Sequence, residues 1–105
     1  MAQRVSEADF KAEVLDSPLP VLVDFYSDSC VPCKRMNPII NALEAEFEGR
    51  AKFVKVNVNF DLALAQKYMV MASPTFVLLK NGKEVARNQG TLAKGDLAAL
   101  VEKAL

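Results

Sequence analysis

The chain has 105 residues, of which 51% are hydrophobic and 25% are charged. This length predicts one domain over residues 1–105, because chains divide into separate cores only beyond about 250 residues, and the composition excludes disordered and low-complexity proteins. Thirteen Lys and Arg residues balance thirteen Asp and Glu residues, which argues against the strongly basic surface that nucleic-acid binding requires.

Two features that the sequence lacks narrow the possible functional classes of the protein further. The chain has no histidine, so any catalysis must proceed without imidazole as a base or metal ligand. No stretch reaches the roughly 18 apolar residues of a transmembrane helix, and residues 1–10 lack the apolar segment of a secretory signal. We therefore expect no membrane partner and a cytoplasmic location.

The first half of the chain predicts two helices around a buried strand. Ser6 and Asp9 resemble a capping box and begin a helix predicted from Glu7 to Asp16. Residues 21–26 form an apolar, β-branched and aromatic run that is typical of a central strand in a parallel sheet. Apolar residues at helical spacing then predict a helix over residues 32–47.

The second half continues the alternation and adds a hairpin. Asn81 and Gly82 tolerate positive φ, which suits a tight antiparallel turn between two strands. Asp61 is expected to cap the short helix that precedes them. The predicted elements are a strand at 53–58, a helix from 61 to about 69, strands at 75–79 and 84–87, and a terminal amphipathic helix through 97–104. With a short first strand at 2–5, this order predicts an α/β sandwich.

Cys30 and Cys33 form a C-x-x-C pair directly after the buried strand and at the start of the next helix. Residues three apart in a first helical turn have Cα atoms about 5 Å apart, within the range of roughly 4.4 to 6.8 Å that a disulfide accepts. Unpaired backbone N–H groups and the helix dipole favour the thiolate of Cys30. Cys30 is therefore the expected nucleophile and Cys33 the expected resolving thiol.

Two other uses of the cysteine pair remain open. A purely structural disulfide would close a four-residue loop and stabilise the fold by only about 2 kcal/mol, and a cytosolic protein rarely carries one. A zinc site would need two further ligands from carboxylates or a second chain, because histidine is absent.

Asp24 lies in the middle of the apolar strand, six residues before Cys30. Burial of a carboxylate disfavours its charged form, so we expect a raised pKa. Its place near the carboxyl end of the strand predicts proton exchange with Cys33 through water. The alternative is a structural acid that is hydrogen-bonded to the backbone or to Lys55.

The run VDFYSDSCVPCKRMNP, followed by SPTFVLLKNGKEV and then by Gly90, resembles the thioredoxin family over nearly the whole chain. The resemblance implies a thioredoxin fold, with a central mixed β-sheet of four to five strands flanked by four helices. It implies a dithiol that reduces protein disulfides. It also implies that Cys30 attacks, that Cys33 resolves, and that Asp24 and Lys55 handle protons.

The resemblance further implies a binding groove and a set of partners. From the residues alone, Pro74 begins a strand. The family resemblance implies instead that Pro74 is a cis proline beside the cysteines. It also implies that the backbone next to this proline binds substrate as an added strand. The implied groove residues are Ser29, Val31, Pro32, Ser73, Pro74, Thr75 and Gly90. The expected partners are disulfide-containing target proteins and thioredoxin reductase or an equivalent electron donor. We expect a monomer with no cofactor other than its redox-active dithiol.

Several positions depart from the family pattern. Ser29 stands where the family has Trp, Tyr26 where it has Trp or sometimes Tyr or Phe, and Val31 where Gly is usual. These departures bear on partner choice and reduction potential. Met69 and Met71 precede Pro74 and serve either as an adaptable contact surface or as core packing.

Two competing functions have clear discriminators. A disulfide oxidase or isomerase is disfavoured by the missing signal segment and by Pro32, and a reduction potential above about −200 mV would support it. A binding or assembly subunit that uses the fold without turnover is disfavoured by intact Cys30, Cys33 and Asp24. Failure to reduce any protein disulfide would support that second reading.

Overall fold

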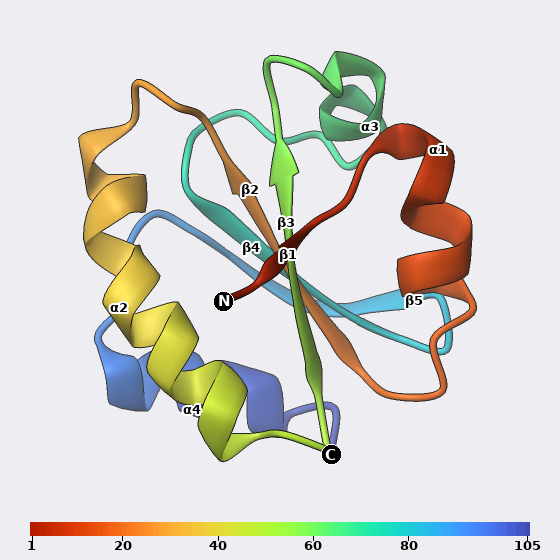
Figure 1. Cartoon of the computed structure of the whole chain (residues 1–105), viewed down its shortest axis with the longest axis vertical. Helices are drawn as coiled ribbons and strands as arrows, with labels where there is room; N and C mark the ends of the chain where they lie inside the picture. Colours follow the sequence, from red (N-terminus) through yellow and green to blue (C-terminus); the bar gives the residue numbers. More distant parts are fainter.

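The computed structural model describes the whole chain, residues 1–105, and contains one five-stranded sheet in the order β1-β3-β2-β4-β5 (Figure 1). The strands are β1 (Gln3–Arg4), β2 (Val21–Tyr26), β3 (Lys52–Asn57), β4 (Thr75–Lys80) and β5 (Lys83–Gln89). The helices are α1 (Glu7–Phe10), its π-helical continuation η1 (Lys11–Leu15), α2 (Val31–Glu46), α3 (Leu62–Lys67) and α4 (Lys94–Glu102). None of them is long and apolar enough to cross a membrane.

The sheet is mixed, as predicted. β3 pairs in parallel with both β1 and β2, whereas β4 pairs antiparallel with β2 and β5. The carboxyl ends of β2, β3 and β5 therefore lie at the same end of the sheet as the amino end of β4. The turn that carries Cys30 and the segment that carries Pro74 both lie at this end.

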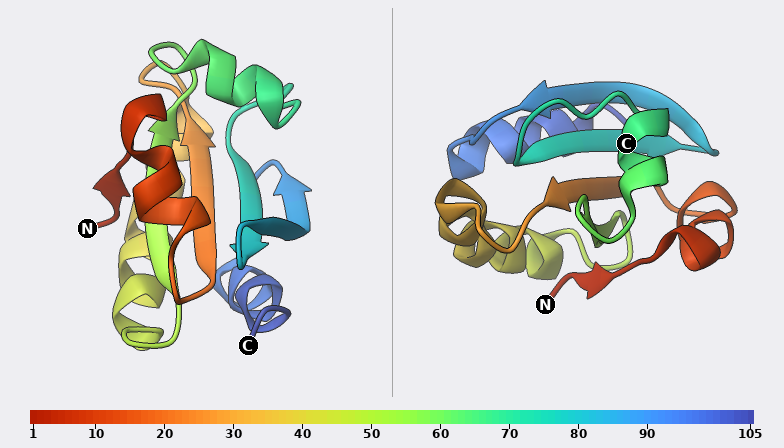
Figure 2. Two further views of the ribbon diagram at one scale, coloured as in Figure 1. Left: turned by 90° about the vertical axis from the view of Figure 1, so that its right-hand side faces the viewer. Right: turned by 90° about the horizontal axis from the view of Figure 1, so that it is seen from above.

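The helices cover the two faces of the sheet in pairs. In the right-hand view of Figure 2, α2 and α4 lie to one side, and α1 and α3 to the other. Successive side chains of a strand point to opposite faces, so Leu22 packs with α2 and α4, while its neighbours Val21 and Val23 pack with the helices of the other face. By the same alternation, Asp24 faces α2.

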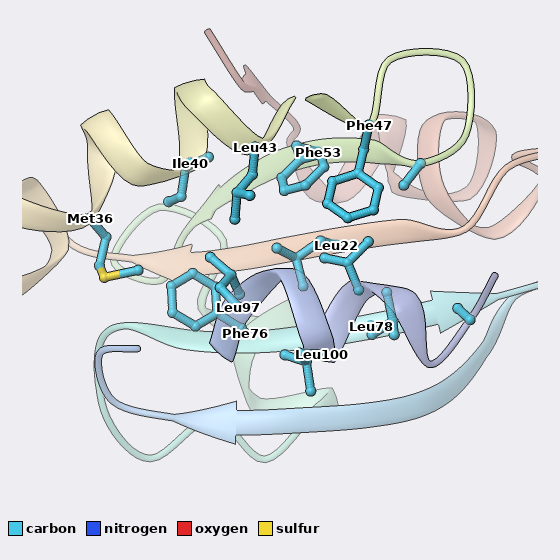
Figure 3. Close-up of a cluster of buried hydrophobic side chains, with 13 residues drawn as sticks. Leu22, Met36, Ile40, Leu43, Phe47, Phe53, Phe76, Leu78, Leu97 and Leu100 are labelled. Carbon is cyan, nitrogen blue, oxygen red and sulfur yellow. The ribbon is translucent and has the colours of Figure 1, made fainter. Parts of the chain in front are cut away.

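Two apolar clusters hold these layers together. Figure 3 shows the cluster of 13 buried residues that α2 and α4 form with the sheet, including Ile40, Leu43 and Leu97. A second cluster of 12 buried residues fills the opposite face. Both clusters follow the predicted periodicity, because each helix buries its apolar stripe and each central strand is covered on both sides.

The hairpin turn forms as predicted, and β5 is longer than predicted. Asn81 and Gly82 have φ values of 53° and 77°, and Lys80 pairs with Lys83 across them. The register shifts next to Leu78 and Leu79, which indicates a β-bulge in β5.

Two predicted caps are wrong. The Ser6 hydroxyl donates to the Asp9 carboxylate at 3.2 Å and caps no backbone group. Asp61 stands at the N-cap position of α3, but its carboxylate accepts a hydrogen bond from the backbone N–H of Glu7, at the start of α1. Tertiary contact between the two helix starts therefore replaces the local cap, which sequence spacing alone does not reveal.

The predicted first helix also differs in its winding. Its α-helical part ends at Phe10, and η1 then widens into a π-helical turn that closes with the backbone N–H of Asp16 donating to Lys11 at 2.8 Å. The element still buries Phe10 and Val14 as the spacing predicted.

Candidate active site

Cys30 and Cys33 are joined by a disulfide at the start of α2, with their Cα atoms 5.2 Å apart. Cys30 is the N-cap residue, and its sulfur accepts a hydrogen bond from the backbone N–H of Cys33 at 3.1 Å. Cys30 is half-buried, whereas Cys33 is only 3% exposed. The pair therefore has one sulfur at the surface, stabilised by the helix start, and one sulfur beneath it.

The segment before β4 lies against this sulfur pair. The Ser73–Pro74 peptide bond is cis, as the resemblance implied, and the Ser73 carbonyl oxygen lies 3.5 Å from the Cys30 sulfur. The backbone N–H of Gly90 donates to the Pro74 carbonyl at 2.8 Å. Ser73, Pro74 and Gly90, which are distant from Cys30 in the sequence, are thus brought to one place beside it.

The other implied groove residues divide into two groups. Ser29, Val31 and Pro32 are exposed around Cys30, and the Val31 side chain is 55% exposed. Thr75 is buried instead, and its hydroxyl donates to the Ala72 carbonyl at 2.6 Å. The Thr75 side chain is therefore turned into the protein, so this residue can contribute only backbone groups to a groove.

Asp24 is buried without a partner. It is 1% exposed, and neither carboxylate oxygen has a hydrogen bond. Burial raises the pKa of Asp24 from 3.8 to about 7, although the positive charge of Lys55 opposes this effect. The structural alternative, in which the backbone or Lys55 satisfies the carboxylate through hydrogen bonds, is wrong.

Lys55 approaches the site from β3, where it is the register partner of Asp24. Its Nζ lies 4.5 Å from the centre of the Tyr26 ring and 3.4 Å from Oδ1 of Asn37, which accepts a hydrogen bond from it. Tyr26 thus has a defined role in this chain, as the aromatic face under the Lys55 ammonium.

A polar cavity of about 210 Å³ adjoins Cys33. This volume is large enough for water molecules. The cavity is lined by Tyr26, Ser27, Asp28, Cys33, Lys34, Asn37 and Lys55. The sequence analysis missed Asn37 and Asp28. Helical spacing could have indicated Asn37, because it lies four residues after Cys33 and so on the same side of α2.

A second cavity, of about 190 Å³, extends from Ser73 along α3 and includes Leu62, Val70 and Met71 among its lining residues. Met71 is 85% exposed and Met69 is 72% exposed, so core packing is the wrong reading for both. Of the two readings, only an exposed apolar surface fits their positions.

No other side chains are placed to complete a metal site with the two cysteines. No group of three or more His, Cys, Asp or Glu side chains in the chain is placed to hold a metal ion. A zinc site at Cys30 and Cys33 would therefore need ligands from outside this chain.

Comparison with known proteins agrees with this geometry. The thioredoxin family model matches residues 1–103. This chain belongs to the thioredoxin family. It is 37% identical over 105 residues to a thioredoxin of Rickettsia felis, with both chains covered completely. It is 39% identical over 102 residues to a thioredoxin of Synechocystis, covering 97% of this chain and 95% of that one. A thioredoxin of Haemophilus influenzae is 38% identical over 99 residues, or 94% of this chain and 92% of its own.

Family membership confirms the predicted fold and activity. A thioredoxin is a thiol–disulfide oxidoreductase, and Cys30 and Cys33 are the active-site pair that cycles between dithiol and disulfide. The half-buried position of Cys30 provides the access that exchange with another disulfide requires.

Proposed function

We propose that Cys30 is the nucleophile and Cys33 the resolving thiol of this protein-disulfide reductase. The observation that carries the assignment is the hydrogen bond from the Cys33 N–H to the Cys30 sulfur at the start of α2, because it stabilises a thiolate at the more accessible of the two positions. Cys33 is buried, so we expect it to attack only a disulfide that Cys30 has formed.

The reaction then balances in two exchanges. The Cys30 thiolate attacks one sulfur of the target disulfide, forms a mixed disulfide, and releases the other target sulfur as a thiolate that takes up a proton. Cys33 loses its proton and attacks the Cys30 sulfur. The Cys30–Cys33 disulfide forms, and the second target thiol leaves. Two electrons pass to the target, and the oxidised protein requires an external donor to regain them.

Asp24 is proposed to exchange a proton with Cys33 through water, with Lys55 beside it. A pKa of about 7 places the carboxyl group near its midpoint of ionisation at neutral pH, where proton transfer in either direction is easiest. Asp24 faces α2, the helix that carries Cys33, and the polar cavity beside Cys33 offers room for water.

The target polypeptide is proposed to lie along the segment at Pro74 as an added strand. The closeness of the Ser73 carbonyl to the Cys30 sulfur supports this, since backbone bound there would hold a target cysteine near the nucleophile. The proposed contact residues are Ser29, Val31, Pro32, Ser73, Pro74, Thr75 and Gly90, with Thr75 acting through its backbone.

The proposed partners follow from the same chemistry. Because the sulfur pair itself carries the two electrons, we propose no bound cofactor and an external donor, thioredoxin reductase or an equivalent. We also propose a cytoplasmic monomer that acts on disulfide-containing proteins. Its balanced charge supports the absence of a nucleic-acid partner.

The roles of the two cysteines are tested by single substitutions. Cys30→Ser is expected to abolish reduction of a disulfide-bonded protein with dithiothreitol as donor, because no thiolate remains at the surface. Cys33→Ser is expected to accumulate a covalent complex with the target, since the mixed disulfide has no resolving thiol. Mass measurement under non-reducing conditions distinguishes them, and a complex trapped by Cys30→Ser instead would reverse the assignment.

Measurement of the reduction potential addresses the competing oxidase or isomerase. Equilibration in graded dithiothreitol or glutathione buffers, followed by thiol trapping, gives the potential of the pair. A value well above about −200 mV would favour the oxidase or isomerase. A potential in the reducing range, with no turnover of any protein disulfide, would favour a non-catalytic subunit.

A further inference from the structure

Asp24 and Lys55 are opposite charges that do not pair. They are register partners on adjacent parallel strands, so their side chains leave the same face of the sheet next to each other. Even so, Lys55 Nζ makes no ion pair with Asp24 within 4.0 Å, and both Asp24 oxygens lack a hydrogen bond. A buried carboxylate attracts a neighbouring ammonium strongly, so something else must hold Lys55 in place.

Two groups other than Asp24 contact the Lys55 ammonium. The Tyr26 ring faces it at 4.5 Å, and Oδ1 of Asn37 accepts its hydrogen bond at 3.4 Å. Asn37 lies one helical turn after Cys33 and reaches from α2 to β3. Lys55, Asn37 and Cys33 all line the same 210 Å³ cavity.

We propose that Asn37 is a positioning residue that keeps the Lys55 ammonium from forming an ion pair with the Asp24 carboxylate, so that Asp24 remains able to exchange a proton with Cys33. The inference rests on the proton role of Asp24 proposed above. Asn37 acts through Lys55 and touches no reacting atom, so it sets the pH at which the resolving step works and does not perform that step.

The other charged residues that line the cavity form no hydrogen bond or ion pair with Lys55. From the turn before α2, Asp28 accepts a hydrogen bond at 3.3 Å from Nδ2 of Asn57, which is buried at the end of β3. Lys34 on α2 is exposed and, like Lys55, is positively charged. Asn37 is therefore the side chain through which α2 binds Lys55.

The direct test is the titration of the Asp24 carboxyl carbon by NMR in Asn37→Ala and Asn37→Asp. Without the amide, Lys55 relaxes toward Asp24, and we expect the pKa of Asp24 to fall by at least about half a pH unit, a threefold change in proton affinity. Asn37→Asp holds Lys55 more firmly and adds a negative charge, so the pKa of Asp24 is expected to rise. A merely structural role would not give shifts of opposite sign.

A double substitution tests whether the effect passes through Lys55. In a Lys55→Met background, Asn37→Ala is expected to leave the titration of Asp24 unchanged. Asn41→Ala is the matched control, because Asn41 is exposed one turn further along the same helix. Circular dichroism of each variant verifies the fold. An unchanged titration in Asn37→Ala, or a shift that persists without Lys55, overturns the proposal.

The test also separates this inference from the proton role of Asp24. If Asp24→Asn leaves turnover unchanged, the proton role fails, yet the titration still reports whether Asn37 controls the distance between Lys55 and Asp24. If the proton role holds, the pH profile of turnover moves in the same direction as the titration in both Asn37 variants.

Discussion

At the scale of single residues, the candidate site includes a buried carboxylate that the fold leaves without a hydrogen bond. Asp24 lies in an otherwise apolar strand that is covered on both faces, and no donor forms a hydrogen bond with it. Such a group opposes folding whenever it is charged. Asp24 faces α2, the helix that carries Cys33, and the proton exchange proposed above would use a group that binds and releases protons near neutral pH.

The cost of Asp24 predicts an unusual pH dependence of stability. Its pKa is about 7 in the folded chain and lower in the unfolded chain, so between about pH 4 and pH 7 the folded state binds more protons. The free energy of unfolding should therefore fall as the pH rises through this window. Above pH 7, once Asp24 is ionised in the folded chain as well, it should fall no further.

Asp24→Asn removes this dependence because an amide does not ionise. At pH 8 the variant is expected to be more stable than the parent by up to about 4 kcal/mol, and at pH 4 by little. Its turnover near neutral pH should be slower, since the proton acceptor is lost. Urea unfolding at both pH values measures the first effect. Equal pH dependence in the two proteins would contradict the burial argument, and equal turnover would demote Asp24 to a structural acid.

At the scale of elements, local patterns predicted the helices and strands, and contacts between elements decided their ends. Strand β2 has the predicted bounds, because its apolar run is continuous from Val21 to Tyr26. The cap predicted at Asp61 is wrong because the Asp61 carboxylate binds the start of a different helix. The turn at Gly82 was predictable, since only its backbone conformation matters for the hairpin.

Gly82→Ala is expected to destabilise the fold by about 1–2 kcal/mol. Its φ of 77° disfavours any side chain, and a Cβ at this position would lie 3.2 Å from the Leu15 carbonyl oxygen, which belongs to the backbone of η1. Urea unfolding measures the loss. Gly95→Ala is the matched control: that position lies in α4 with open space around it, and alanine there should be neutral or stabilising. Equal effects at both positions would refute the conformational argument.

At the scale of the whole molecule, the two apolar clusters carry the fold and the disulfide contributes little. The clusters contain 13 and 12 buried residues on opposite faces of the sheet. The bridge joins residues only three positions apart. This division suits a carrier of electrons, because its sulfur pair must open and close while everything else stays in place.

Reduction is therefore expected to leave the protein folded and to lower its free energy of unfolding by about 2 kcal/mol, the contribution of a four-residue loop. Urea unfolding with and without dithiothreitol measures the difference. A variant with both Cys30→Ser and Cys33→Ser should match the reduced protein and ignore the reductant. Loss of far-ultraviolet circular dichroism on reduction alone would show that the bridge, and not the core, maintains the fold.

The sequence by itself determined the chemistry of the sulfur pair and the class of the fold. Cys30, Cys33 and Asp24 lie within ten residues, and the roles proposed for them follow from one strand, one turn and one helix start. The periodicity of the apolar residues likewise encodes the α/β layers, because burial depends on local repeat lengths.

Tertiary structure alone decided what surrounds that pair. Ser73, Gly90 and Lys55 lie near the cysteine pair only because strands distant in the chain begin or end at the same end of the sheet. Whether Lys55 would neutralise Asp24 or be held by Asn37 depends on how α2 packs against β3. Distances between side chains on different elements follow from packing, which no spacing along the chain specifies.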